Sequence, residues 1–259
     1  MAGLSRQNKV SSVFLALQGL AILFLSSPAY RPLYASFLTA DTLQTQLTHH
    51  AVTALAVHQL AVVRIAYLAA AWLLAGAIIH MLSGTVWRKQ YEAGLKKRAG
   101  WFHWVTSGIG AALIIATVGL LAGVYDGAAL LTLILLTVAA ALAGFGYEYA
   151  GTMGKRARTA QCLSGWLAVI FGLMPWVVVA LYMLNAEIFG NGPVLPAYWF
   201  WLCGVALAGM VLWAGNIYMG QVRRGRWASY LYAERVGMGI SVIVKTAAAW
   251  LLFATFLRP

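Results

Sequence analysis

The chain has 259 residues, of which 62% are hydrophobic and only 9% are charged. Soluble domains carry about 25% charged residues, so this composition excludes an ordinary water-soluble fold. The formal net charge of +12 does not indicate nucleic-acid binding, because the basic residues cluster in alternate gaps between apolar stretches, where they mark membrane topology.

Seven apolar stretches recur along the chain, each close to the ~20 residues that a helix needs to cross a bilayer. They cover residues 10–29, 60–83, 101–124, 127–149, 162–184, 197–220 and 236–256. We therefore expect an all-α membrane protein: one domain, residues 1–259, folded as a seven-transmembrane-helix bundle in the cell membrane, with the lipid bilayer as its main partner.

The basic residues predict the orientation of the bundle. Fourteen of the eighteen Lys and Arg residues precede the first span or follow spans two, four and six, whereas only Arg31, Arg64 and Arg258 lie on the other side. Since positive loops stay inside, the N-terminus is expected in the cytoplasm and the C-terminus outside.

The first outer loop, about residues 30–59, is long. Within it, residues 43–58 alternate polar and β-branched side chains, which predicts a short extracellular β-hairpin. A disordered polar loop is the alternative. A second outer loop, residues 185–196, is rich in turn-forming residues.

Lys245 lies near the middle of the last span, about ten residues after Glu234. A lysine at this depth costs at least about 2.5 kcal/mol, so a functional role is expected. A desolvated, neutral amine can attack an aldehyde and form a Schiff base. Ser241, one helical turn earlier on the same face, is placed to hydrogen-bond near that nitrogen. The alternatives are a structural ion pair or snorkelling for the lysine, and a bond within the helix for the serine.

No acidic residue is clearly placed to neutralise Lys245. Five of the six acids, Glu234 among them, map to loops or interfaces. The sixth, Glu148, enters the membrane near the cytoplasmic end of span four, where we expect an interfacial carboxylate beside Lys155 and Arg156.

Two histidines raise a rival hypothesis. His80 ends span two and His103 begins span three, and two histidines at similar depth on neighbouring helices can hold a haem iron, as in a b-type cytochrome. The other three histidines, in the outer loop, have no carboxylate or cysteine at ligand spacing, so no metal site is expected.

Trp176 follows Pro175 near the middle of span five. A proline there opens the helix and leaves room for a rigid aromatic wall beside a ligand, while ordinary helix packing is the alternative.

The closing segment resembles the heliorhodopsins, whose last helix carries the retinal lysine in a similar frame, here W..YL..ER.....S...K...AW. Further matches are FHWV at 102–105, FGY at 145–147, GLMPW at 172–176, Trp166 and His80. The family has an inverted topology with the N-terminus inside, as the charge distribution independently predicts. Type-1 microbial rhodopsins share the lysine but have the opposite orientation.

This resemblance implies that Lys245 carries all-trans retinal as a covalent Schiff base, that Ser241 is its neighbour, and that Trp176 and Gly172 belong to the pocket wall. The family's usual counterion is a glutamate two residues after a tryptophan in span three, and Thr106 occupies that position here. Ala139 and the GAA segment at 110–112 likewise stand where the family has polar residues. A buried protonated Schiff base needs a nearby negative charge. We therefore expect either a neutral Schiff base or a bound chloride near Thr106 and Ser107.

The function that the resemblance implies is a light-sensing protein rather than an enzyme. It would be a homodimeric, non-pumping photoreceptor that signals to an unknown cytoplasmic partner and binds no nucleic acid. The alternative is a b-type cytochrome or a small transporter with a structural buried lysine.

Overall fold

The computed structural model describes residues 2–190 and 196–259. Within these residues, seven helices are long and apolar enough to cross a membrane, which confirms the predicted fold class. They are α1 (Ala2–Leu25), α3 (Ile65–Gly84), α5 (Trp101–Leu121), α6 (Gly127–Thr152), α7 (Arg158–Phe189), α8 (Ala197–Val222) and α9 (Tyr230–Leu252).

Several boundaries differ from the prediction, among them the start of α9, which lies six residues earlier than expected. Helix α1 begins eight residues earlier than expected, because its polar residues face α3: Ser12 Oγ donates to the Ala77 carbonyl at 2.7 Å, and Ser5 Oγ to that of Gly84 at 3.1 Å. Residues 60–64 belong to a strand instead of a span. Residues 185–189 continue α7 instead of starting a turn, while residues 191–195 of that predicted loop lie outside the described residues.

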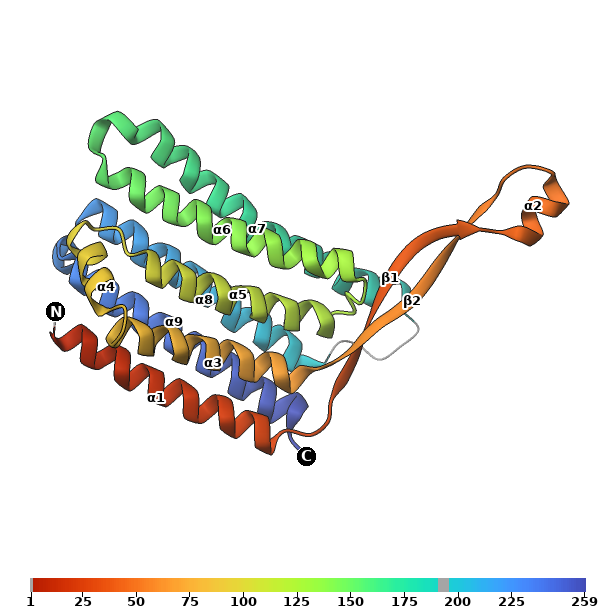
Figure 1. The fold of residues 1–259 in the computed structure, drawn as a ribbon, viewed down its shortest axis with the longest axis horizontal. Coiled ribbons are helices and arrows are strands. Elements are labelled where there is room, and N and C mark those ends of the chain that lie inside the picture. Colours follow the sequence, from red (N-terminus) through yellow and green to blue (C-terminus); the bar gives the residue numbers. More distant parts are fainter. Residues whose placement is uncertain (1, 191–195) are drawn as a thin grey trace.

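The predicted hairpin is present, but it is longer than expected and placed differently. Strands β1 (Tyr30–Ala40) and β2 (Thr53–Arg64) pair antiparallel and project beyond the bundle (Figure 1). The short helix α2 (Thr42–Thr48) forms the tip where strand was predicted, because Asp41 caps it by accepting from the Gln44 N–H.

Shorter elements connect the spans at the opposite end. Helix α4 (Arg88–Lys96) follows α3, the 3₁₀ turn η1 (Gly154–Ala157) follows α6, and a second turn, η2 (Gly225–Ala228), precedes α9. The last helix continues as a π-helical turn, η3 (Phe253–Leu257). The N-terminus lies beside α4 and the C-terminus near the hairpin (Figure 1), so we call these the α4 end and the hairpin end of the bundle.

Helices α3 and α5 form the centre of the bundle. They are the most buried of the seven, whereas α6 and α7 pack on each other at one side and expose most of their surface (Figure 1). Small residues on α3, among them Ala66, Ala69 and Ala77, are fully or almost fully buried and let neighbouring helices approach closely. Trp72 therefore fits inside the core, and its indole N–H donates to the Lys245 carbonyl at 3.3 Å.

Asp126 joins the hairpin to the bundle. Its carboxylate accepts from the Ala129 N–H at 2.9 Å and caps α6, and the neighbouring Tyr125 carbonyl accepts from the Tyr34 N–H at 2.7 Å. The Ala129 N–H and the Ser36 hydroxyl lower the pKa of Asp126 below its ordinary value.

We expect Asp126→Ala to destabilise the protein by about 1 kcal/mol, because the first turn of α6 loses its cap. Because the folded-state pKa of Asp126 is lowered, the capping contribution is present at neutral pH and is lost as the pH falls below the ordinary aspartate range. Denaturation of the purified protein at pH 7 and pH 3 checks this: the difference between wild type and variant should shrink at pH 3. An Asp41→Ala variant at the hairpin tip is the control and should leave the bundle unchanged.

Candidate functional site

A cavity of about 570 Å³ lies inside the bundle between α5, α6, α7, α8 and α9. This volume falls in the range of small-molecule sites, and the lining is almost entirely apolar and aromatic. Five of the six predicted site residues line it: Lys245, Ser241, Ser107, Gly172 and Trp176. Residues up to 138 positions apart, from Ser107 to Lys245, are thus brought to one cavity.

Lys245 is 3% exposed, and its Nζ donates to Ser241 Oγ at 2.6 Å. The two residues are one turn apart on α9, so the helix itself sets this contact. No Asp or Glu of the described residues forms an ion pair with Lys245. The lysine is therefore not held by a structural ion pair.

Gly110 on α5 makes space that the lysine side chain fills. A Cβ at Gly110 would lie 2.5 Å from Lys245 Cε, too close for the lysine to stay in place, whereas a Cβ at Gly76 on α3 would be in ordinary contact with Lys245 Cδ at 3.6 Å. Gly110 is the first residue of the GAA segment, which stands where the family has polar residues. At this position the small residue has a steric function, because it leaves room for Lys245.

Thr106 does not line the large cavity. It is buried, its hydroxyl donates to the Phe102 carbonyl at 3.0 Å, and it lies beside a second, small cavity of about 20 Å³. That volume holds about one water molecule. Ser107, Trp213 and Ser241 line both cavities. The small cavity therefore continues the site from Lys245 toward the α4 end.

His80 and Asn8 border the small cavity from α3 and α1. His80 Nδ1 lies 2.7 Å from Asn8 Oδ1, so this nitrogen carries the proton and donates it. Three buried polar atoms at this cavity have no protein partner: His80 Nε2, Asn8 Nδ2 and Trp213 Nε1.

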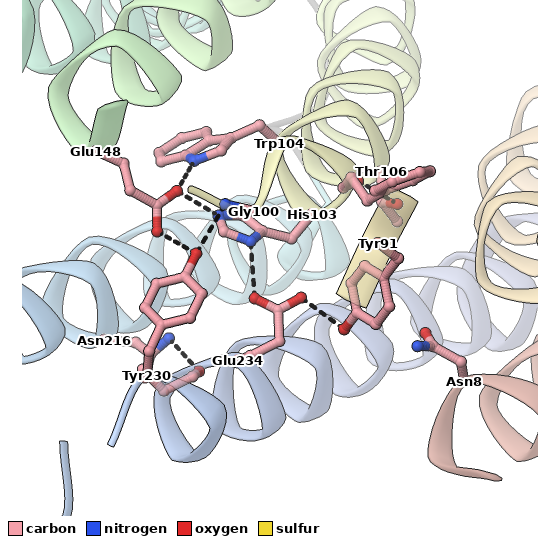
Figure 2. Close-up of polar contacts among 12 residues, drawn as sticks. Asn8, Tyr91, Gly100, His103, Trp104, Thr106, Glu148, Asn216, Tyr230 and Glu234 are labelled. Atoms are coloured by element: carbon pink, nitrogen blue, oxygen red, sulfur yellow. Dashed lines mark hydrogen bonds and ion pairs between the residues drawn. The ribbon is translucent and has the colours of Figure 1, made fainter. Parts of the chain in front are cut away.

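Beyond the small cavity, His103 lies between two buried carboxylates (Figure 2). His103 Nδ1 is 2.9 Å from Glu234 Oε2, and His103 Nε2 is 3.3 Å from Glu148 Oε2. Glu148 and Glu234 are 2% and 6% exposed. Glu148, expected as a carboxylate beside Lys155 and Arg156, is therefore buried against His103, and Glu234 lies within α9 because that helix begins before the predicted span. We call Glu148, His103 and Glu234 the acid–imidazole cluster.

Neighbouring helices supply further donors to both carboxylates (Figure 2). Glu148 accepts from Trp104 Nε1 at 2.7 Å and from the Tyr230 hydroxyl, while Glu234 accepts from the Tyr91 hydroxyl at 2.9 Å. Burial and the Glu234 carboxylate raise the pKa of Tyr91 on α4 well above its ordinary value, so Tyr91 keeps its proton and donates.

The sequence contains one signal for this cluster, in the spacing of residues along α9. Glu234, Ser241 and Lys245 are spaced by seven and four residues, which places all three on one face of α9. The face of α9 that carries Lys245 into the core therefore also carries Glu234, three turns before it. Nothing in the sequence pairs Glu148 with His103, because they come from different helices.

This geometry gives no support to the haem hypothesis. Both nitrogens of His103 face carboxylates, and the cavity between His80 and His103 is far too small for a porphyrin.

Taken together, the fold and the site define a multi-pass, seven-helix membrane protein with a buried lysine at an internal apolar cavity, the arrangement of a rhodopsin-type bundle. Residues 4–257 match the heliorhodopsin family model, and the chain belongs to the heliorhodopsin family. It is accordingly a retinal-binding, light-sensing membrane protein. A search of curated proteins gave no match.

The residues of the large cavity fit the retinal that the family implies. An apolar polyene needs an apolar cavity, and an aldehyde needs an amine at its wall; the cavity provides both.

Proposed function

We propose that this protein is a photoreceptor in which Lys245 holds all-trans retinal as a Schiff base. The observation that carries the proposal is the Lys245 amine at the wall of the 570 Å³ apolar cavity, with Ser241 as its hydrogen-bond partner. Retinal supplies the light absorption and the isomerisation. The chain's own residues hold it: Lys245 anchors one end, and Gly172 and Trp176 on α7 line the cavity wall.

Purification with all-trans retinal tests this proposal. We expect an absorption band that appears only when retinal is supplied and that hydroxylamine bleaches, because hydroxylamine cleaves a Schiff base. A Soret band in protein purified without retinal would instead indicate haem.

The charge of the Lys245 nitrogen is the open part of the proposal. No carboxylate of the described residues is bonded to it, and Thr106 occupies the usual counterion position. A proton on this nitrogen would be unfavourable unless an anion compensates it. Either the nitrogen is neutral and the protein absorbs in the ultraviolet, or chloride near Thr106 and Ser107 compensates the charge.

A spectral titration with pH and with chloride distinguishes these two arrangements. If chloride compensates the charge, its removal should move the absorption maximum from the visible to the ultraviolet, and its return should restore it. If the nitrogen is neutral, lowering the pH should produce the visible band without chloride. A visible maximum that responds to neither would contradict both and would point to a carboxylate of the protein.

The proposal includes a signalling role without ion pumping, since a pump needs titratable groups along the whole path through the membrane. The buried ionisable groups of the described residues, other than Lys245, gather toward the α4 end. We propose that this end is cytoplasmic, as the basic loops indicate, and that it contacts an unknown partner. A homodimer is the expected assembly, and crosslinking in membranes checks it.

A further inference from the structure

The acid–imidazole cluster can carry a net charge equal and opposite to that of a protonated Lys245. Each nitrogen of His103 faces a carboxylate oxygen, so the imidazole is protonated on both nitrogens when both acids are ionised. One imidazolium and two carboxylates give a net charge of −1. One added proton makes the cluster neutral.

The two carboxylates are not equivalent. Each carboxylate accepts two hydrogen bonds, Glu148 from Trp104 and Tyr230 and Glu234 from Tyr91 and His103, while His103 Nε2 faces Glu148 at 3.3 Å without a hydrogen bond. They differ in what lies beside them: Glu234 lines the small cavity that Ser241 also lines, and Glu148 does not. The proton that neutralises the cluster therefore belongs on Glu234.

The small cavity separates Glu234 from Ser241, the hydrogen-bond partner of Lys245. Lys245 Nζ donates to Ser241 Oγ at 2.6 Å, and Ser241 and Glu234 both line the small cavity, which has room for about one water molecule. Ser241 follows Glu234 by two helical turns, or roughly 10 Å along α9. A hydroxyl and one water molecule are suitable carriers of a proton over this gap.

We propose that Glu234 is the internal proton partner of Lys245: one proton is exchanged between the Lys245 nitrogen and the Glu234 carboxylate through Ser241 and the small cavity. When the proton is on the nitrogen, Lys245 carries +1 and the cluster −1. When it is on Glu234, both are neutral. The N–H bond that breaks is replaced by the O–H bond that forms, and the total charge does not change.

The other groups around the cluster do not take this role. The titratable side chains that border Glu234 and His103 are His80 of α3, Tyr91 of α4, Glu148 of α6 and Tyr230 of α9, while α1 and α8 contribute the neutral Asn8, Trp213 and Asn216; Lys245 reaches the small cavity only through Ser241. Tyr91 and Tyr230 already donate their protons to the carboxylates. A proton on His80 would create a second buried cation near Lys245, whereas a proton on Glu234 removes a buried negative charge.

The inference rests on the proposed role of Lys245, but its central test needs no retinal. Infrared spectroscopy of the full-length apoprotein with ¹³C-labelled glutamate follows the carboxylic-acid C=O band of the four glutamates as the pH is raised. We expect Lys245→Met to raise the pH at which this band disappears by about one unit, the effect of removing a unit charge on the order of 10 Å away. The band should be lost in Lys245→Met/Glu234→Gln.

Two comparisons assign the band. Lys245→Met/Glu92→Gln changes a partly exposed glutamate on α4 and should keep the shifted band, and Lys245→Met/His80→Gln should keep it as well. An unshifted midpoint in Lys245→Met overturns the inference, and so does a band that persists without Glu234. Because wild type and Lys245→Met can be compared alone, the test stands even if a Glu234 variant fails to fold.

In protein loaded with all-trans retinal that absorbs in the visible in the dark, and whose nitrogen is therefore protonated, the same C=O band should rise in the light-minus-dark spectrum and should be lost in Glu234→Gln. Retinal binding without any Glu234 band would overturn only this inference. Absence of a chromophore, with the apoprotein shift intact, would overturn only the proposed function.

Discussion

Lys245→Ala is expected to abolish the retinal-dependent absorption band completely, because no other lysine lies inside the described part of the bundle. The apoprotein, by contrast, should be no less stable than wild type, since the substitution removes a buried amine that costs at least about 2.5 kcal/mol in the membrane. Absorption spectra with added all-trans retinal measure the first effect, and thermal denaturation of the apoprotein measures the second.

Lys89→Ala, on the exposed surface of α4, is the matched control and should keep the full band. A Lys245→Ala protein that still forms a hydroxylamine-sensitive chromophore would show that retinal is attached elsewhere.

Glu148→Ala should have the largest effect on stability, a loss of about 3–5 kcal/mol, because it leaves a buried charge network without one of its partners. The Trp104 and Tyr230 donors and one nitrogen of His103 would lose their acceptor. Denaturation of the purified protein in mixed micelles measures the loss of unfolding free energy.

Glu92→Ala is the control for this prediction, since Glu92 pairs only with Arg88 on the same exposed helix. It should change stability little, because surface ion pairs within a helix contribute weakly. Equal effects of the two substitutions would contradict the structural role assigned to Glu148.

The number of membrane spans could be predicted from the sequence, because the hydropathy of a segment depends only on the residues that it contains. Hydropathy misplaced the start of α1, because Ser5 and Asn8 look like loop residues but are buried against α3. Hydropathy treats every polar residue as exposed. It cannot recognise one that a neighbouring helix satisfies.

Contacts of the candidate site within one helix could be predicted from the sequence, whereas contacts between helices could not. The pair Lys245 and Ser241 follows from one turn of α9, and both residues line the large cavity. The acid–imidazole cluster depends on how α5, α6 and α9 face one another, which no spacing within a single helix encodes. For that reason Glu148 and Glu234 were assigned to the interface, although they are among the most buried acids of the described residues.

Gly110 has a consequence for the evolution and engineering of this protein's colour. Its hydrogen is all that fits against the end of the Lys245 side chain, since even a methyl group there would displace the amine. An acid introduced at position 110 as a counterion would therefore displace the Lys245 amine whose charge it should compensate. Spectral tuning is therefore better attempted from the Ser241 face of α9, or from Asn8 and His80, where unpartnered polar atoms already border the small cavity.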